Sequence, residues 1–263
     1  MENFAHFDFI FVLAGALVGL LVGLTGVGGG SLMTPLLTLI FGVSPSIAVG
    51  TDLAFASLTK GVGTLAHRIE NNVCWPIVRL LSLGSLPASL LTIYALNLLG
   101  NVSSDWQYLI KMSIGVSVLL TAVSLIFRPK MHAWLEQNPQ FLLQGRKQVF
   151  ATVLSGILIG VLVTISSIGA GAIGASLILF LYPHLKPAQV AGTDIAYAVP
   201  LTAVAALGHL WLGTIHLDLL ISLLIGSVPA IWCGAKLTKL ISERISRAIL
   251  AGVLTLVGFK LIL

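Results

Sequence analysis

The chain has 263 residues, of which 57% are hydrophobic and only 9% are charged, and its formal net charge is +5. A soluble domain usually carries about 25% charged residues, because its surface must meet water. This composition argues against a soluble enzyme and predicts that lipid covers most of the surface. The cations lie in short runs between apolar segments and not in a basic patch with interleaved aromatic residues, so we expect no nucleic-acid partner.

The cysteines give no sign of a metal site or a disulfide framework. Cys74 and Cys233 lie in or beside apolar segments, and their spacing matches no metal-binding pattern. The sequence has no ATP-binding motif and no Ser-His-Asp order, so we expect no metal, no cofactor and no enzymatic activity. Residues 1–8 contain acids but neither Lys nor Arg, unlike the basic start of a secretory signal, so we expect no cleaved leader.

Apolar segments long enough to cross a bilayer follow one another along the chain. A spanning helix needs about 20 apolar residues. Two shorter segments, 31–42 and 173–182, each follow a break rich in small residues and are too short to span alone. We therefore predict an all-α polytopic membrane protein with about eight full transmembrane helices and two short broken helices. The long segments are 8–24, 47–66, 74–98, 106–127, 148–165, 188–209, 217–238 and 246–263.

One long polar stretch, residues 128–147, divides the chain almost at its midpoint. It contains Arg128, Lys130, Arg146 and Lys147, and cytoplasmic loops of membrane proteins carry an excess of Lys and Arg. We therefore predict a first membrane repeat over 1–127, a cytoplasmic linker over 128–147 and a second membrane repeat over 148–263.

The two halves carry matching sequences 142 residues apart. Several matches in one register are hard to obtain by chance, so we predict a duplication. The matches pair 50–56 (GTDLAFA) with 192–198 (GTDIAYA), 65–67 with 207–209, and 84–88 (GSLPA) with 226–230 (GSVPA). Upstream, 25–30 aligns with 166–171 when one residue is inserted in the second copy.

Loop charges predict how the two halves are oriented. The loop 67–72 carries Arg68, whereas its counterpart 209–216 carries no Lys or Arg. The loop 100–105 has no cation, whereas its counterpart 236–247 has four. Equivalent loops thus prefer opposite sides of the membrane, and five segments per half give the odd number that inversion requires. We predict an inverted repeat of two five-segment halves, an arrangement common in secondary transporters, with both termini outside.

The first candidate site is the pair of breaks that precede the short segments. Consecutive glycines at 28–30 leave backbone N–H groups bare at the start of a helix, where the helix dipole favours an anion. The second copy offers small residues and two serine hydroxyls. Close packing of helices through small residues is the alternative. The residues expected to bind substrate are Thr25, Gly28, Gly29, Gly30, Ser31, Ser166, Ser167, Gly169, Ala170 and Gly171.

The second candidate site is the repeated Thr-Asp pair. Asp52 and Asp194 lie some six residues inside their predicted spans, about 10 Å deep at 1.5 Å per residue. A carboxylate at that depth is costly and usually faces a partner or a watery path, so these acids suit proton or cation coupling. A helix-capping or interhelical hydrogen bond is the structural alternative. We include the preceding Thr51 and Thr193 in this set.

Lys60 and two histidines complete the candidates. Lys60 shares a span with Asp52 but has no counterpart, since the equivalent residue is Thr202. Its ammonium could neutralise a bound anion, pair with an acid or snorkel to the cytoplasmic face. His67 and His209 end matching spans, where an interfacial position and a gating role are both open.

Several of these segments resemble the TauE/SafE sulfite exporter family. The residues that carry the resemblance are 23–30 (GLTGVGGG), 34–37 (TPLL), 48–51 (AVGT) and 66–68 (AHR). The likeness covers nearly the whole chain, because the second half repeats the pattern weakly. It implies an anion transporter of a bacterial inner membrane that acts on sulfite, sulfoacetate or a related organosulfur compound. Asp52 and Asp194 stand where the family commonly has Ser or another small residue, which leaves room for a different substrate or coupling.

The leading hypothesis is therefore a secondary transporter that exports a small sulfur-containing anion. Alternating access would take place around a site at the bilayer midplane, formed by the two broken helices. A passive anion channel and a cation- or proton-coupled transporter of a different solute are the alternatives. The expected partners are the small anion and the lipid bilayer, with a homodimer left open as the assembly.

Overall fold

The computed structural model describes residues 9–25, 30–69, 71–98, 104–138, 142–237 and 243–262. Within these ranges the chain forms ten α-helices and no strand, so the predicted all-helical class is confirmed. The first half contains α1 (Phe9–Thr25), α2 (Gly30–Leu39), α3 (Pro45–Ile69), α4 (Trp75–Leu98) and α5 (Ser104–Gln137). The second half contains α6 (Gly145–Ser166), α7 (Ala172–Leu181), α8 (Pro187–Trp211), α9 (Leu217–Leu237) and α10 (Glu243–Ile262).

Each predicted apolar segment coincides with one helix, and the short segments are the ten-residue helices α2 and α7. The largest difference is at α5, which extends to Gln137 and so takes in half of the polar stretch 128–147. The residues that continue this helix include Lys130, Met131, Ala133, Leu135 and Glu136, all of which have high helix propensity. Polarity therefore marked the end of the apolar span but not the end of the helix.

Four stretches of the described helices are both long and apolar enough to cross a bilayer, namely α4, α6, α8 and residues 106–135 of α5. The apolar helical stretches 9–21, 172–181, 217–233 and 250–261 are shorter. Helix α3 has 25 residues, but Asp52, Lys60 and Arg68 reduce its apolar character. The finding supports a polytopic membrane protein, while the count of eight full spans stays a prediction.

The outer surface of the helical bundle is apolar. Leu83 and Leu91 on α4, Phe150 on α6 and Leu256 on α10 are each at least 66% exposed. A soluble monomer rarely exposes large contiguous apolar patches. Several polar side chains, in contrast, lie inside the bundle, including Asp52, Asp194, Lys60 and His209. This distribution is the one expected when lipid and not water surrounds the helices.

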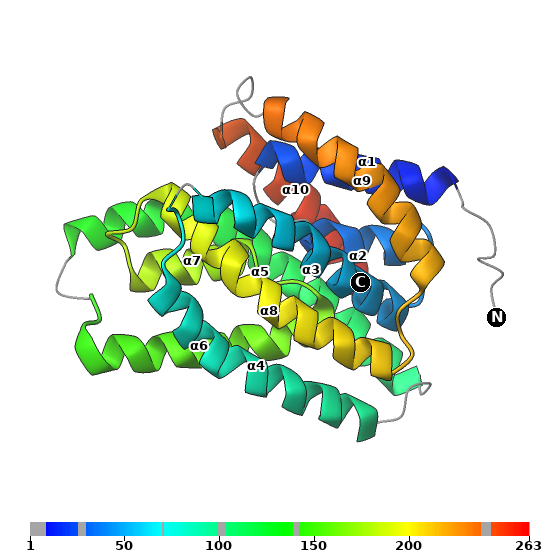
Figure 1. Ribbon diagram of the computed structural model, residues 1–263, viewed down its shortest axis with the longest axis horizontal. Helices are drawn as coiled ribbons and strands as arrows, with labels where there is room; N and C mark the ends of the chain where they lie inside the picture. The colour runs from blue at the N-terminus through cyan, green and yellow to red at the C-terminus, as the bar shows by residue number, and fades with distance from the viewer. Residues whose placement is uncertain are drawn as a thin grey trace.

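Helices from the two halves pack against each other in exchanged pairs (Figure 1). Helix α1 packs on α9, and its counterpart α6 packs on α4. Helices α3 and α8 pack on each other in the middle, as do α5 and α10. Neither half therefore forms its own separate bundle, and residues of both halves meet at the crossing of α3 and α8.

Glycines at equivalent positions allow the exchanged pairs to approach closely. A Cβ atom at Gly84 would collide with the Val153 carbonyl oxygen, and one at Gly226 would collide with the Val12 carbonyl oxygen. Gly84 and Gly226 are equivalent under the predicted repeat, and so are their partner helices α6 and α1. Small residues let helix backbones approach in this way in membrane proteins.

Candidate functional site

Asp52 lies buried on α3 and is held by a hydrogen bond from α2. The Thr34 hydroxyl donates to Asp52 Oδ2 at 2.6 Å. The other carboxylate oxygen, Oδ1, is also buried and has no hydrogen-bond partner among the described residues. Ser167, from the break between α6 and α7, lies near enough to interact with this carboxylate. Asp52 therefore faces a residue of the opposite half.

Asp194, the equivalent acid on α8, lies at the start of α7. Gly174 in the first turn of α7 is so close to Asp194 Oδ1 that a Cβ at this position would collide with it. The backbone N–H of Gly171, at the N-cap of α7, also interacts with the carboxylate. Asp194 is 3% exposed, and its Oδ1 accepts no hydrogen bond within the described part of the chain.

Lys60 connects the two acids. Its Nζ donates to the Ala170 carbonyl oxygen at 2.7 Å, across from α3 to the break before α7. Lys60 as a whole is 7% exposed, and its ammonium interacts electrostatically with both Asp194 and Asp52. The predicted alternative in which Lys60 snorkels to the membrane surface is therefore wrong. A buried ammonium with two carboxylates is the largest group of charges inside the bundle that the described residues show.

Two further hydroxyls, which the sequence did not single out, belong to this region: Tyr197 lies beside Asp194, and Ser85 lies beside Tyr197. Tyr197 is one helical turn after Asp194 and interacts with it and with Ser85 of α4. The Tyr197 and Ser85 hydroxyl oxygens are buried, and neither has a hydrogen-bond partner in the portion of the chain described. The residue equivalent to Tyr197 is Phe55, so the second half carries a hydroxyl that the first half lacks. This difference between the repeats is the sequence feature that could have identified Tyr197 as a candidate.

The break between α6 and α7 has the irregular backbone that the small residues predict. Ser167, Gly169 and Gly171 have φ angles of 60°, 131° and 144°, which belong to the region that favours glycine. The Ser166 hydroxyl donates to the Leu162 carbonyl and accepts from the Ile168 N–H, so it stabilises the break. The Ser167 hydroxyl is buried and makes no hydrogen bond to any described residue.

The equivalent break before α2 is seen only in part. Gly28 and Gly29 lie outside the described residues, and so do the side chains of Thr25 and His67. Gly30 begins α2, and Ser31 follows it as a buried residue in the first turn. The proposed roles of these residues in substrate binding stay predictions.

Thr51 and Thr193 make equivalent contacts with the loops of the opposite half. The Thr193 hydroxyl accepts a hydrogen bond from the Cys74 N–H at 2.9 Å, and the Thr51 hydroxyl accepts one from the His216 N–H at 3.2 Å. Cys74 and His216 are themselves equivalent under the 142-residue offset. The two threonines therefore fix the loops that precede α4 and α9.

His209 is fully buried and joins three elements. Its Nε2 donates to the Thr164 carbonyl of α6 at 2.9 Å, because that carbonyl can only accept. Its Nδ1 lies 2.8 Å from the Thr214 hydroxyl in the turn before α9. The position at the membrane interface and the gating role of His209 both stay predictions.

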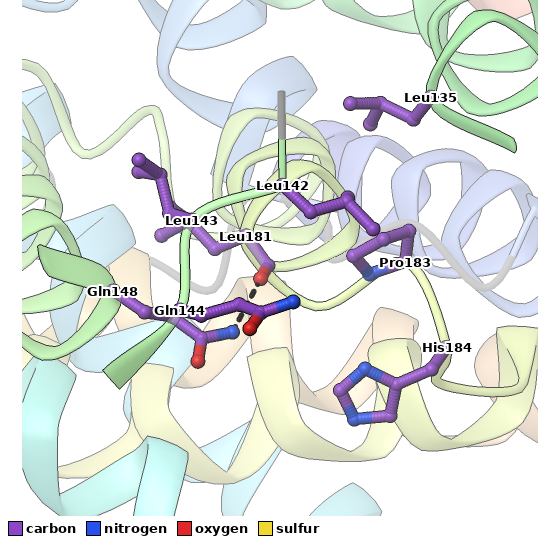
Figure 2. A pocket seen from close by; sticks show the side chains of 8 residues that line it. All are labelled: Leu135, Leu142, Leu143, Gln144, Gln148, Leu181, Pro183 and His184. Carbon is purple, nitrogen blue, oxygen red and sulfur yellow. Dashed lines mark hydrogen bonds between the residues drawn. The ribbon is translucent and has the colours of Figure 1, made fainter. Parts of the chain in front are cut away.

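A separate pocket of about 410 Å³ lies where residues of the central stretch 128–147 meet the α7–α8 turn (Figure 2). In Figure 2, Gln148 donates its amide to the Leu181 carbonyl, and His184 stands at the other side. The pocket includes none of the buried acids or Lys60. Its lining residues are Leu135, Leu142, Leu143, Gln144, Gln148, Leu181, Pro183 and His184, which offer no Lys, Arg, Asp or Glu.

The chain is similar over nearly its whole length to membrane transporters. The family model described as "Sulfite exporter TauE/SafE" matches residues 11–261. The probable membrane transporter protein YjnA of Bacillus subtilis (strain 168) is 36% identical over 251 residues, covering 95% of this chain and 98% of that protein. The probable membrane transporter protein YdhB of the same organism is 26% identical over 236 residues, covering 89% and 91% of the two chains. No solved structure matches.

Proposed function

Because the chain belongs to the TauE/SafE sulfite exporter family, and is thus a membrane transport protein, we propose that it is a secondary transporter of a small sulfur-containing anion. The proposed substrates are sulfite and short organosulfonates, and the proposed direction is export across a bacterial inner membrane. The observation that carries this proposal is the buried group of Asp52, Lys60 and Asp194 at the crossing of α3 and α8. Charges inside a membrane protein usually mark a substrate or ion path.

The proposed architecture is an inverted repeat with the site between its halves. The exchanged packing of α1 on α9 and α6 on α4 supports it, as do the equivalent hydrogen bonds of Thr51 and Thr193. In an inverted repeat the two breaks approach each other from opposite sides of the bilayer, near its midplane. Because helices of both halves pack together in pairs, rocking of one group of packed helices against another would then expose the site to each side in turn.

The orientation is tested by labelling from outside the cell. We expect a cysteine at the exposed Gln144, in a chain with Cys74→Ser and Cys233→Ser, to resist an impermeant maleimide until the membrane is opened. The physical reason is the positive charge of the central segment, which favours the cytoplasmic side. A cysteine at the exposed Asp218, in the first turn of α9, serves as the control that should react from outside. Labelling of Gln144→Cys in intact cells would reverse the proposed orientation.

The proposed substrate class is tested by flux from proteoliposomes. We expect labelled sulfite and methanesulfonate to leave vesicles that contain the protein much faster than empty vesicles, and a pH gradient to change the rate. Chloride and choline are the control solutes of the same experiment. A flux of the cation alone would favour the alternative cation transporter and would contradict the proposed function.

A further inference from the structure

The start of α7 is built like an anion site, and the chain's own Asp194 carboxylate occupies it. A helix N-terminus carries a partial positive charge, which stabilises a nearby anion. The Lys60 ammonium lies at the same place, because it bonds the Ala170 carbonyl one residue before the N-cap Gly171. The Asp194 carboxylate contacts Gly174 and interacts with both the Gly171 N–H and Lys60. Two sources of positive charge therefore converge on one carboxylate.

The surroundings of this carboxylate hold polar atoms that the protein leaves without partners. Asp194 Oδ1 is buried and accepts no hydrogen bond within the described ranges. The Tyr197 and Ser85 hydroxyls lie near each other and are also buried, but their geometry makes no complete hydrogen bond with any described residue. The Ser167 hydroxyl, which lies near Asp52, is also buried and makes no hydrogen bond to a described residue. Buried polar groups are almost always hydrogen-bonded in native proteins. This concentration of unused hydroxyls points to a ligand with several acceptor oxygens.

We propose that Asp194 takes the place of the transported anion in the substrate-free protein, and that a monoanion enters this place only together with a proton for Asp194. This inference rests on the proposed function and adds to it the coupling ion and the charge of the substrate. The proton binds to a carboxylate oxygen of Asp194 and makes the acid neutral. The neutral acid releases Lys60 and the start of α7, which then bind the oxyanion.

The net charge of the buried group explains why one proton should enter together with one monoanion. Without substrate, the cations Lys60 and Arg128 compensate the carboxylates Asp194 and Asp52, of which Asp52 keeps its hydrogen bond from Thr34. A monoanion with one proton leaves the net charge of the buried group unchanged. A monoanion without the proton would leave an additional uncompensated charge in a site of low dielectric, which is costly. A dianion such as sulfate would leave that extra charge even with one proton.

Other charged groups that face Asp194 do not change this balance. Arg128 of α5 interacts with Asp194 and is half-buried, and its guanidinium stays protonated in both states. Tyr197 is the other titratable side chain close to the carboxylate, and it remains a neutral donor. Asp52 also interacts with Lys60, so it is the natural comparison for Asp194. The two acids differ in their partners. Asp52 accepts a hydrogen bond from the Thr34 hydroxyl of α2, whereas Asp194 interacts with the Gly171 N–H and is the stronger electrostatic partner of Lys60.

The test measures proton uptake when methanesulfonate binds to the purified full-length protein. Methanesulfonate remains a monoanion over the working pH range, so any proton that is taken up goes to the protein. Calorimetric titrations in buffers of different ionisation enthalpy give the number of protons per bound anion. We expect about one proton for the wild type, and about tenfold weaker binding for each unit of pH above the range where Asp194 is protonated. Sulfate is expected to bind much more weakly than methanesulfonate.

Matched variants assign the proton. Asp194→Asn, which mimics the protonated acid, should bind methanesulfonate with no proton uptake and with an affinity that does not change with pH. Asp52→Asn, the equivalent change in the other half, should retain the uptake of one proton. Tyr197→Phe removes the hydroxyl and gives position 197 the same residue as the equivalent position, Phe55. It should weaken methanesulfonate binding about tenfold and leave the number of protons taken up per bound anion unchanged.

The possible outcomes distinguish a failure of this inference from a failure of the proposed function. Binding by the wild type without proton uptake overturns the inference and leaves the transporter proposal intact. Loss of proton uptake in Asp52→Asn but not in Asp194→Asn overturns it as well. Binding of neither methanesulfonate nor sulfite contradicts the proposed function and the inference together. If Asp194→Asn fails to fold, the number of protons that the wild type takes up per bound anion still tests the proposed coupling.

Discussion

Replacing Lys60 with threonine is expected to lower anion transport about 100-fold or more. Truncating one partner of a buried, hydrogen-bonded charge pair in a binding site costs about 2–5 kcal/mol of binding free energy, and each 1.4 kcal/mol corresponds to a factor of ten. Lys60 is the cation that compensates the buried acids, and in the proposed mechanism it also binds the substrate. Threonine is the residue at the equivalent position 202, where its hydroxyl bonds the Ala198 carbonyl of its own helix, so the change fits a helix of this bundle.

The measurement is the initial rate of sulfite flux from proteoliposomes that contain equal amounts of folded protein. Lys147→Thr, in the exposed first turn of α6, is the control for loss of one positive charge. It should transport like the wild type. If Lys60→Thr also transports like the wild type, the buried ammonium has no part in transport and the proposed site must lie elsewhere.

Replacing Gly226 with valine is expected to destabilise the fold strongly. A Cβ at Gly226 would collide with the Val12 carbonyl oxygen, which is backbone and cannot rotate away. Overpacking of a protein interior costs about 1–3 kcal/mol and occasionally more, and the rigid neighbour places this change at the high end. Gly84→Val should have a similar effect, because Gly84 meets the Val153 carbonyl in the equivalent helix pair.

Thermal unfolding of the detergent-solubilised protein, followed by size-exclusion chromatography, measures this effect. Gly252→Val is the control, since a Cβ at this position of α10 has no neighbour within 4 Å. We expect the control to keep the melting temperature of the wild type and both interface variants to lose monodisperse protein on mild heating. Equal stability of Gly226→Val and Gly252→Val would contradict the close packing of α1 on α9.

The sequence predicted most of the fold because hydrophobicity dominates helix placement in lipid. Each long apolar run became a helix, and the glycine- and serine-rich segment 166–171 became a break. The internal duplication also located Asp52 and Asp194 in advance, since both acids lie inside the bundle. The helical extension of α5 was missed because polarity ends an apolar span without ending helix propensity.

The contacts of the candidate site were harder to predict, because they join residues far apart in the chain. Lys60 bonds Ala170, which is 110 residues away, and no local pattern indicates that pairing. Thr34 and Ser85 are ordinary hydroxyl residues in the sequence, and only the packing places them near the acids. Tyr197 differs from Phe55 of the first half, as Lys60 differs from Thr202, and both differences converge on Asp194. Positions at which the two repeats differ therefore indicate the site better than positions at which they match.

Counterflow tests the central claim, that this protein carries a small sulfur-containing anion, most directly. Proteoliposomes are loaded with unlabelled sulfite and diluted into a trace of labelled sulfite at constant pH. A carrier exchanges internal for external substrate, so we expect label to accumulate inside for a time above its equilibrium level and then to decline. Label that rises to equilibrium without this overshoot would identify a passive channel and contradict the carrier function. Entry no faster than into empty vesicles would contradict transport of sulfite altogether.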